Sequence, residues 1–218
     1  MQIIHSVIWL PAPGRQADTV AAFAAAKKIH ESYGAKVRGF SNLVAGTNSG
    51  RLAYTLRHND WAAFAKFGQA LQADAAWQAL WASLQGANPV ATMETNVLVN
   101  VIEETAGTLP SGTGARVRSF RGYAFDPARR DEAVALLSAQ RKVLEGFGGH
   151  TTISQLQYGG PLVNRVSSSI EYADMSAFAG ARDKMNTDAS FQAAIAKLSA
   201  AGSPLTLMAT SLITELPI

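Results

Sequence analysis

The chain of 218 residues contains no cysteine. This absence excludes disulfide bonds, metal sites built from thiolates, and cysteine nucleophiles. A chain without cysteine is well suited to a reducing compartment, and we expect a cytoplasmic protein.

Charge and long apolar runs are also scarce. Only 16% of the residues are charged, the net charge is +3, and lysine and arginine form no run of five or more. Nucleic acid or an anionic membrane usually requires a denser basic patch, so neither is expected as a partner. No stretch approaches the roughly 18 apolar residues of a membrane span, and residues 1–15 lack the segments of a signal peptide.

What the sequence does contain is a repeated stretch. Residues 60–84 return 114 residues later as residues 174–198, without a gap. The same offset aligns residues 1–104 with residues 115–218 from end to end. Between them, residues 105–114 have the Gly, Ser, Thr and Pro composition of a flexible linker. We therefore predict two tandem repeats joined by this linker.

Each repeat shows the same order of elements. Short β-branched and aromatic runs predict strands, and apolar residues at every third or fourth position predict helices. Asp60 and Asp74, with their equivalents Asp174 and Asp188, are expected to be N-caps of helices. The predicted strands are 3–10, 37–45, 52–58, 92–102, 117–125, 151–158, 166–172 and 206–215, and the predicted helical regions are 16–33, 60–84, 130–147 and 174–198.

The order β-α-β-β-α-β is that of the ferredoxin-like unit, a four-stranded antiparallel sheet with helices on one face. The other face of each sheet is left uncovered. We therefore predict an α+β fold in which two such sheets pack face to face, either within one chain or with a second chain in a homodimer.

The element order, the repeat length and the motif D-x-x-[WF]-Q-A at residues 74–79 and 188–193 resemble those of the dimeric α+β barrel superfamily. This superfamily includes antibiotic-biosynthesis-monooxygenase-like and NIPSNAP-like proteins. The resemblance covers nearly the whole chain and implies a barrel formed by two ferredoxin-like units. It also implies functions that range from cofactor-independent oxygenases and isomerase-like enzymes to haem-binding proteins, and similarity of fold does not choose among them.

No local motif marks an active site or a metal site, so candidate residues come from strand alternation, which sends successive side chains to opposite faces. In the first strands we assign one alternating set to the barrel interior, namely Ile3, His5, Val7 and Trp9 with their equivalents Val117, Ser119, Arg121 and Tyr123. Trp9 and Tyr123 would be ligand-binding walls, and His5 and Arg121 catalytic groups, because a histidine titrates near neutrality and acts as a base. Interface roles for His5 and Arg121 remain the alternative.

In the third strands, Arg57 and Glu171 occupy equivalent positions in a small, polar set that we also assign to the interior. They would bind a polar part of a substrate or form an ion pair with each other. The other histidines are interpreted structurally: His30 as a packing residue, His58 as a hydrogen-bonded strand end, and His150 as an exposed loop residue.

Three functions remain open at this point. The first is binding of a small apolar or aromatic ligand between the sheets, with monooxygenase-like or isomerase-like activity and no cofactor. The second is a haem-binding module, in which His5, His30 or His58 would be the axial ligand. The third is a non-catalytic barrel that serves structure or assembly.

Overall fold

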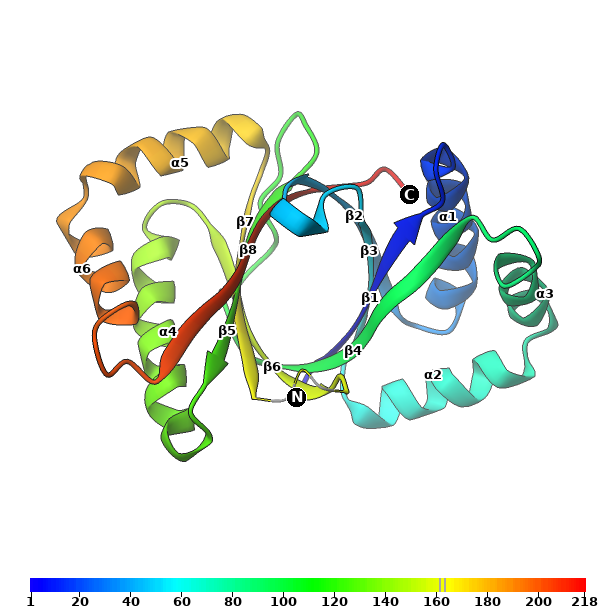
Figure 1. The fold of residues 1–218 in the computed structure, drawn as a ribbon, viewed down its shortest axis with the longest axis horizontal. Helices are drawn as coiled ribbons and strands as arrows, with labels where there is room; N and C mark the ends of the chain where they lie inside the picture. The colour runs from blue at the N-terminus through cyan, green and yellow to red at the C-terminus, as the bar shows by residue number, and fades with distance from the viewer. Residues whose placement is uncertain (161, 163) are drawn as a thin grey trace.

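The computed structural model describes residues 1–160, 162 and 164–218, apart from the side chain of Thr47. Its strands close into one antiparallel barrel in the order β1-β3-β2-β8-β5-β7-β6-β4 (Figure 1). The strands are β1 (Ile3–Pro11), β2 (Lys36–Val44), β3 (Leu52–His58), β4 (Ala91–Glu104), β5 (Val117–Phe125), β6 (His150–Tyr158), β7 (Arg165–Tyr172) and β8 (Leu205–Glu215).

The α-helices lie outside the barrel in two groups. One group, α1 to α3, covers the outer wall on one side, and the other, α4 to α6, covers the opposite side (Figure 1). No helix in the described part of the chain is long and apolar enough to cross a membrane. The helices are α1 (Gln16–Ser32), α2 (Trp61–Ala73), α3 (Ala75–Leu84), α4 (Arg130–Glu145), α5 (Met175–Thr187) and α6 (Ala189–Leu198), with 3₁₀ turns at Gly46–Asn48 and Pro127–Arg129.

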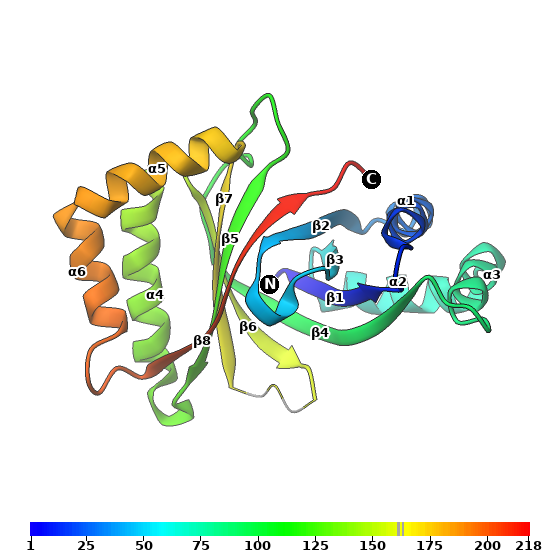
Figure 2. The ribbon, with the colours of Figure 1, turned by 45° about the horizontal axis from the view of Figure 1, so that its top comes forward.

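The predicted α+β class and the order of the elements are confirmed, and the same order occurs twice along the chain. The division at residues 105–114 stays a prediction. The two predicted sheets are joined at both edges, because β2 pairs with β8 and β4 pairs with β6. Figure 2 shows β8 crossing from β5 toward β2. The barrel therefore closes within one chain.

Helices α2, α3, α5 and α6 each begin directly after an aspartate of the repeated stretch. The side chains of Asp60 and Asp74 accept hydrogen bonds from backbone N–H groups three residues on, at 2.8 and 2.6 Å. Asp174 and Asp188 do the same at 2.9 and 2.8 Å. Each carboxylate satisfies an N–H group that the first helical turn leaves free. These caps set where α2, α3, α5 and α6 begin.

Candidate functional site

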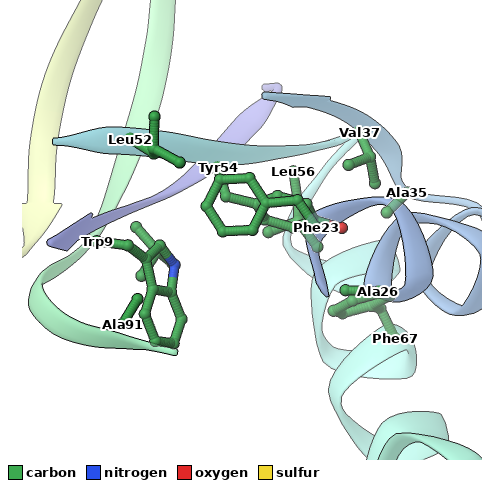
Figure 3. Close-up of a cluster of buried hydrophobic side chains, with 11 residues drawn as sticks. Trp9, Phe23, Ala26, Ala35, Val37, Leu52, Tyr54, Leu56, Phe67 and Ala91 are labelled. Carbon is green, nitrogen blue, oxygen red and sulfur yellow. The ribbon is translucent and has the colours of Figure 1, made fainter. Parts of the chain in front are cut away.

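A cavity of about 240 Å³ lies between the barrel wall and helices α1 to α3; we call it the helix-side cavity. Its walls are largely aromatic, with Trp9 from β1, Phe23 from α1 and Tyr54 from β3. Figure 3 shows these three side chains within the buried cluster of the first half. An apolar cavity of about 150 Å³ is known to bind benzene. The helix-side cavity therefore has room for an aromatic molecule of one or two rings.

The spacing of residues on two helices builds this cavity. Helix α1 presents Phe23, Ala26 and His30 along one face. Helix α3 presents Trp77 and Trp81 four residues apart, with their rings stacked at a centroid distance of 5.5 Å. None of the ten residues of α3 is fully buried. The two tryptophans have the spacing that is typical of core residues, but they border a hollow.

His5 and Asn96 form the polar end of the helix-side cavity. The Nε2 atom of His5 lies 2.6 Å from Oδ1 of Asn96. An amide oxygen only accepts hydrogen bonds, so Nε2 carries the hydrogen and Nδ1 keeps the lone pair that a base needs. Burial lowers the pKa of His5 more than the hydrogen bond to Asn96 raises it, so the imidazole is neutral at pH 7. Asn96 is exposed, which places this end of the cavity near solvent.

Two further histidines lie in the same half. Nδ1 of His30 is 2.9 Å from the Tyr54 hydroxyl, and His58 packs on Phe67 with ring centroids 4.7 Å apart. Burial, reinforced by the nearby His5, lowers the pKa of both His30 and His58 to about 4. His30 is buried as expected but also lines the cavity. His58 is not the expected hydrogen-bonded strand end, since its Nε2 has no partner among the described residues.

The corresponding region of the second half is packed differently. The positions equivalent to His5, His30 and His58 hold Ser119, Leu144 and Tyr172. Leu144 and Tyr172 are buried in a hydrophobic cluster. Neutral histidines and a ligand-sized hollow on the helix side thus occur together in the first half.

A second cavity, of about 450 Å³, lies inside the barrel; we call it the barrel cavity. Serine and threonine hydroxyls line it together with apolar side chains from both halves. Every ionised side chain among its described lining residues is an arginine, namely Arg57, Arg118 and Arg165.

A buried network of ion pairs supports the wall of the barrel cavity. Glu171 accepts hydrogen bonds from Arg38 at 2.9 and 2.6 Å and from Arg118 at 3.1 and 2.6 Å. Glu215 accepts from Arg38 and Arg116. Burial raises the pKa of Glu171, but the guanidinium groups of Arg118 and Arg38 outweigh it and lower the pKa to about 2. The carboxylate is therefore ionised at neutral pH.

The structure corrects the predicted facing of the first strands. Trp9 packs against Phe23 under helices α1 to α3, and Tyr123 belongs to the hydrophobic cluster under α4 to α6. The barrel cavity is lined instead by the alternate residues, which include Ile4 and Phe120. Trp9 is still a wall of a cavity, but of the helix-side one.

His5 and Arg121 are not brought together. His5 lines the helix-side cavity of the first half. Burial raises the pKa of both Tyr123 and Tyr172, and the nearby charge of Arg121 opposes this rise, so Arg121 lies beside these rings and faces the helices of the second half. The two side chains lie on opposite outer faces of the barrel and cannot act on the same small ligand.

Arg57 and Glu171 lie on the inner side as predicted, but the expected ion pair between them is wrong. Arg57 donates two hydrogen bonds to Glu104, at 3.0 and 2.7 Å, because this carboxylate on β4 is within reach. His150 is also placed differently from the prediction, since it is buried at the start of β6 with Nε2 3.3 Å from Glu104. The ligand-binding roles of Arg57 and Glu171 stay predictions.

Sequence reasoning missed Asn96 as a partner of His5. The position equivalent to Asn96 is Thr210, so the two repeats differ at both members of the pair. A comparison of the repeats could therefore have found Asn96, whereas its proximity to His5 depends on the pairing of β1 with β4.

The helix-side cavity does not fit a haem. His5 and His30 offer ring nitrogens, but the tryptophans of α3 bound a space of only about 240 Å³. None of the described residues that line it is a cation that could pair with the carboxylates of a porphyrin. Within the described part of the chain, no group of three or more His, Asp and Glu residues could hold a metal ion.

No protein-family model and no curated protein matches the sequence. Solved structures do match the fold. A candidate monooxygenase from Fusobacterium nucleatum subsp. nucleatum has a TM-score of 0.69 at 10% identity, over 98% of this chain and 92% of that chain. An anthrone oxidase-like protein has a TM-score of 0.66 at 13% identity, over 99% of this chain and 91% of that chain.

A chlorite dismutase variant from Candidatus Nitrospira defluvii is also similar, with a TM-score of 0.51 at 9% identity, over 96% of this chain and 90% of that chain. Identities this low carry information about the fold and not about the reaction. The chain therefore has the ferredoxin-like α+β barrel fold that these monooxygenase-like and chlorite dismutase-like structures share, with the whole barrel formed by one chain.

Proposed function

We propose that the chain binds a small, electron-rich aromatic molecule in the helix-side cavity and that His5 removes a proton from it. The observation that carries this proposal is the pairing of His5 with Asn96 at the open end of an aromatic cavity. This site differs from the ligand position predicted from the sequence, which was between the sheets.

The chemistry follows from the surroundings of the imidazole. Burial keeps His5 neutral, so its lone pair is free to accept a proton at neutral pH. The rings of Trp9, Trp77 and Trp81 would hold a flat aromatic substrate by edge and face contacts. Removal of a proton from a phenol, or from a carbon between aromatic rings, leaves an anion rich in electrons.

Such an anion can pass electrons directly to molecular oxygen, which would give an oxygenase-like reaction without a cofactor. It can also take a proton back at another position, which would give an isomerase-like reaction. The names of two structural neighbours, a candidate monooxygenase and an anthrone oxidase-like protein, favour the oxygenase-like reaction.

Binding and turnover of hydroxylated naphthalenes test the proposal. Quenching of tryptophan fluorescence reports binding beside Trp77 and Trp81, and an oxygen electrode reports turnover. We expect Ala22→Phe, which fills the helix-side cavity from α1, to abolish quenching. We expect His5→Ala to retain binding and to lose turnover. Ser119→Ala, at the equivalent position of the second half, is the matched control and should behave as wild type.

The outcomes separate the alternatives. Exchange of a carbon-bound hydrogen of the substrate with deuterated water that depends on His5, without oxygen uptake, would indicate an isomerase-like reaction. Binding without either exchange or oxygen uptake would indicate a binding protein. If Ala22→Phe binds the naphthalenes as tightly as wild type, the helix-side cavity is not their site and the proposal fails.

A further inference from the structure

Arg165 lines the barrel cavity, and no carboxylate in the described part of the chain forms an ion pair with it. Its Nη1 atom is buried and has no hydrogen-bond partner among the described residues. The other two arginines of the cavity are satisfied, Arg57 by Glu104 and Arg118 by Glu171. A buried donor without an acceptor is unfavourable, and such groups in native proteins call for an explanation.

The equivalent arginine of the first half does have an anionic partner. Arg51 is equivalent to Arg165, and it forms a two-pronged ion pair with Glu94, one contact of which measures 3.0 Å. The position equivalent to Glu94 holds Met208. The second half thus has the cation without the side-chain anion that balances it in the first half.

Strand pairing places Arg165 and Met208 at the same end of the barrel. On β5, Ala124 lies opposite Arg165 of β7 on one side and opposite Thr206 of β8 on the other. Both Arg165 and Met208 line the barrel cavity, whereas neither Arg51 nor Glu94 is among its lining residues. Met208 is 53% exposed, so the cavity meets solvent beside the unpaired guanidinium.

The inner side of the barrel also carries excess positive charge. Three guanidinium groups, those of Arg38, Arg116 and Arg118, share only two carboxylates, those of Glu171 and Glu215. The excess positive charge therefore attracts an anion into the barrel, in addition to the attraction of Arg165 itself.

The remaining wall of the cavity is mainly apolar. Val97, Val99, Phe120 and Leu156 line it. Its volume of about 450 Å³ lies within the range of roughly 300–1,000 Å³ that is usual for small-molecule sites. A ligand that matches this site has one anionic group and an apolar body.

We propose that the barrel cavity binds an amphipathic organic carboxylate, whose anionic group pairs with Arg165 and whose apolar body lies along Phe120 and Leu156. The carboxylate takes the place that Glu94 occupies beside Arg51 in the first half. This second site is separate from the helix-side cavity and does not depend on the function proposed for it.

Octanoate, with octanamide as the uncharged probe of equal length, tests the proposal by isothermal titration calorimetry and by thermal shift. We expect wild type to bind octanoate at least about tenfold more tightly than octanamide, because a charge-assisted pair is lost in the amide. Arg165→Gln should remove this preference. Met208→Glu should also remove it, because the new carboxylate would pair with Arg165 as Glu94 does with Arg51. Met208→Gln, which adds no charge, should keep it.

Ala22→Phe, which fills the helix-side cavity, should bind octanoate as wild type does, and this result would assign the ligand to the barrel. Equal affinity for octanoate and octanamide in wild type would overturn the proposal, as would undiminished binding of octanoate by Met208→Glu. A loss of octanoate binding in Ala22→Phe would also overturn it. Chemical denaturation of each variant shows that the loss does not result from unfolding.

Discussion

Arg38 of β2 and Glu171 of β7 form a bidentate ion pair, with donor–acceptor distances of 2.9 and 2.6 Å, across 133 residues of sequence. The pair joins the first half of the barrel to the second. Glu171 is 3% exposed, so the interaction is shielded from water.

Replacement of Glu171 by glutamine should destabilise the protein strongly. The change leaves the guanidinium groups of Arg38 and Arg118 without their shared anion in a buried site, which typically costs about 3–5 kcal/mol. The free energy of unfolding from urea denaturation measures the effect. Glu94→Gln breaks the more exposed pair with Arg51 and should cost less than about 1 kcal/mol. Equal losses in the two variants would contradict the assigned role of the buried network.

The stability of the protein should fall as the pH decreases from 6.5 to 4. An unfolded histidine binds a proton below pH 6.5, whereas His30 in the folded protein does so only near pH 4. The unfolded state therefore binds more protons in this window, and the difference for His30 is on the order of 3 kcal/mol by pH 4. His30→Leu, which introduces the residue found at Leu144, should make the curve less steep, while His58, whose pKa is also lowered to about 4, keeps part of the slope.

The measurement for this prediction is urea denaturation at several pH values. Wild type and His30→Leu should differ in slope between pH 6.5 and 4, and run parallel above pH 7. Loss of stability through Glu171 begins as the pH falls below its unfolded pKa of 4.5 and continues to about 2, so most of it lies below the window of His30. Parallel curves throughout would show that His30 is not held neutral by its surroundings.

Gly149 should not tolerate alanine, although its equivalent in the first half is Ala35. A methyl group at Gly149 would collide with Cγ2 of Ile170. The residue equivalent to Ile170 is Leu56, which is not branched at Cβ and leaves this space free. We expect Gly149→Ala to cost about 1–3 kcal/mol in thermal or chemical denaturation.

Gly68 provides the matched control for this substitution. It lies within α2, and an added methyl group would meet no atom within 4 Å. Gly68→Ala should therefore stabilise the protein by about 0.5–1 kcal/mol through helix propensity. A neutral result for Gly149→Ala would mean that β7 shifts to make room.

Substitution of Asn96 by aspartate should raise the pKa of His5. A carboxylate beside Nε2 stabilises the imidazolium ion, which the apolar surroundings now disfavour. NMR titration of the His5 ring protons follows the change directly, without a substrate. Thr210→Asp, at the equivalent position of the second half, should leave the His5 titration unchanged. An unaltered pKa in Asn96→Asp would exclude the contact with His5.

Local features of the fold were accessible from sequence because their causes lie within a few residues. The aspartate caps are an example, and so are Gly34 and Gly148, which follow α1 and α4 with φ of 84° and 78°. Strands 52–58 and 117–125 are predicted with the bounds that the structure has. Such signals do not depend on which strands become neighbours.

The facing of β1 was predicted wrongly because it depends on register. Trp9 lies opposite Leu52 of β3, and His5 lies opposite Leu56. Residues directly opposite each other share a face of the sheet. The residues of β3 that pack under the helices, including Tyr54, therefore carry Trp9 and His5 to the same side. Only the pairing of two distant strands reveals this.

The helix-side cavity was not predictable from the spacing of the apolar residues along α3. Trp77 and Trp81 have the spacing of core residues, and so do their equivalents Phe191 and Ile195. Phe191 is buried, whereas neither tryptophan is. Side chains with this spacing can either fill a core or border a hollow. The outcome depends on the summed volume of side chains from several elements, and the spacing along one helix gives no information about that volume.

Closure of the barrel affects how this protein can associate with other molecules. Each strand from β1 to β8 is hydrogen-bonded on both sides within the described part of the chain. The pairing is partial along two strands, because among the described residues 91–97 of β4 pair only with β1 and residues 205–211 of β8 pair only with β5. Closure therefore shortens the strand edge that a peptide or a second molecule could extend, and confines it to segments of this kind.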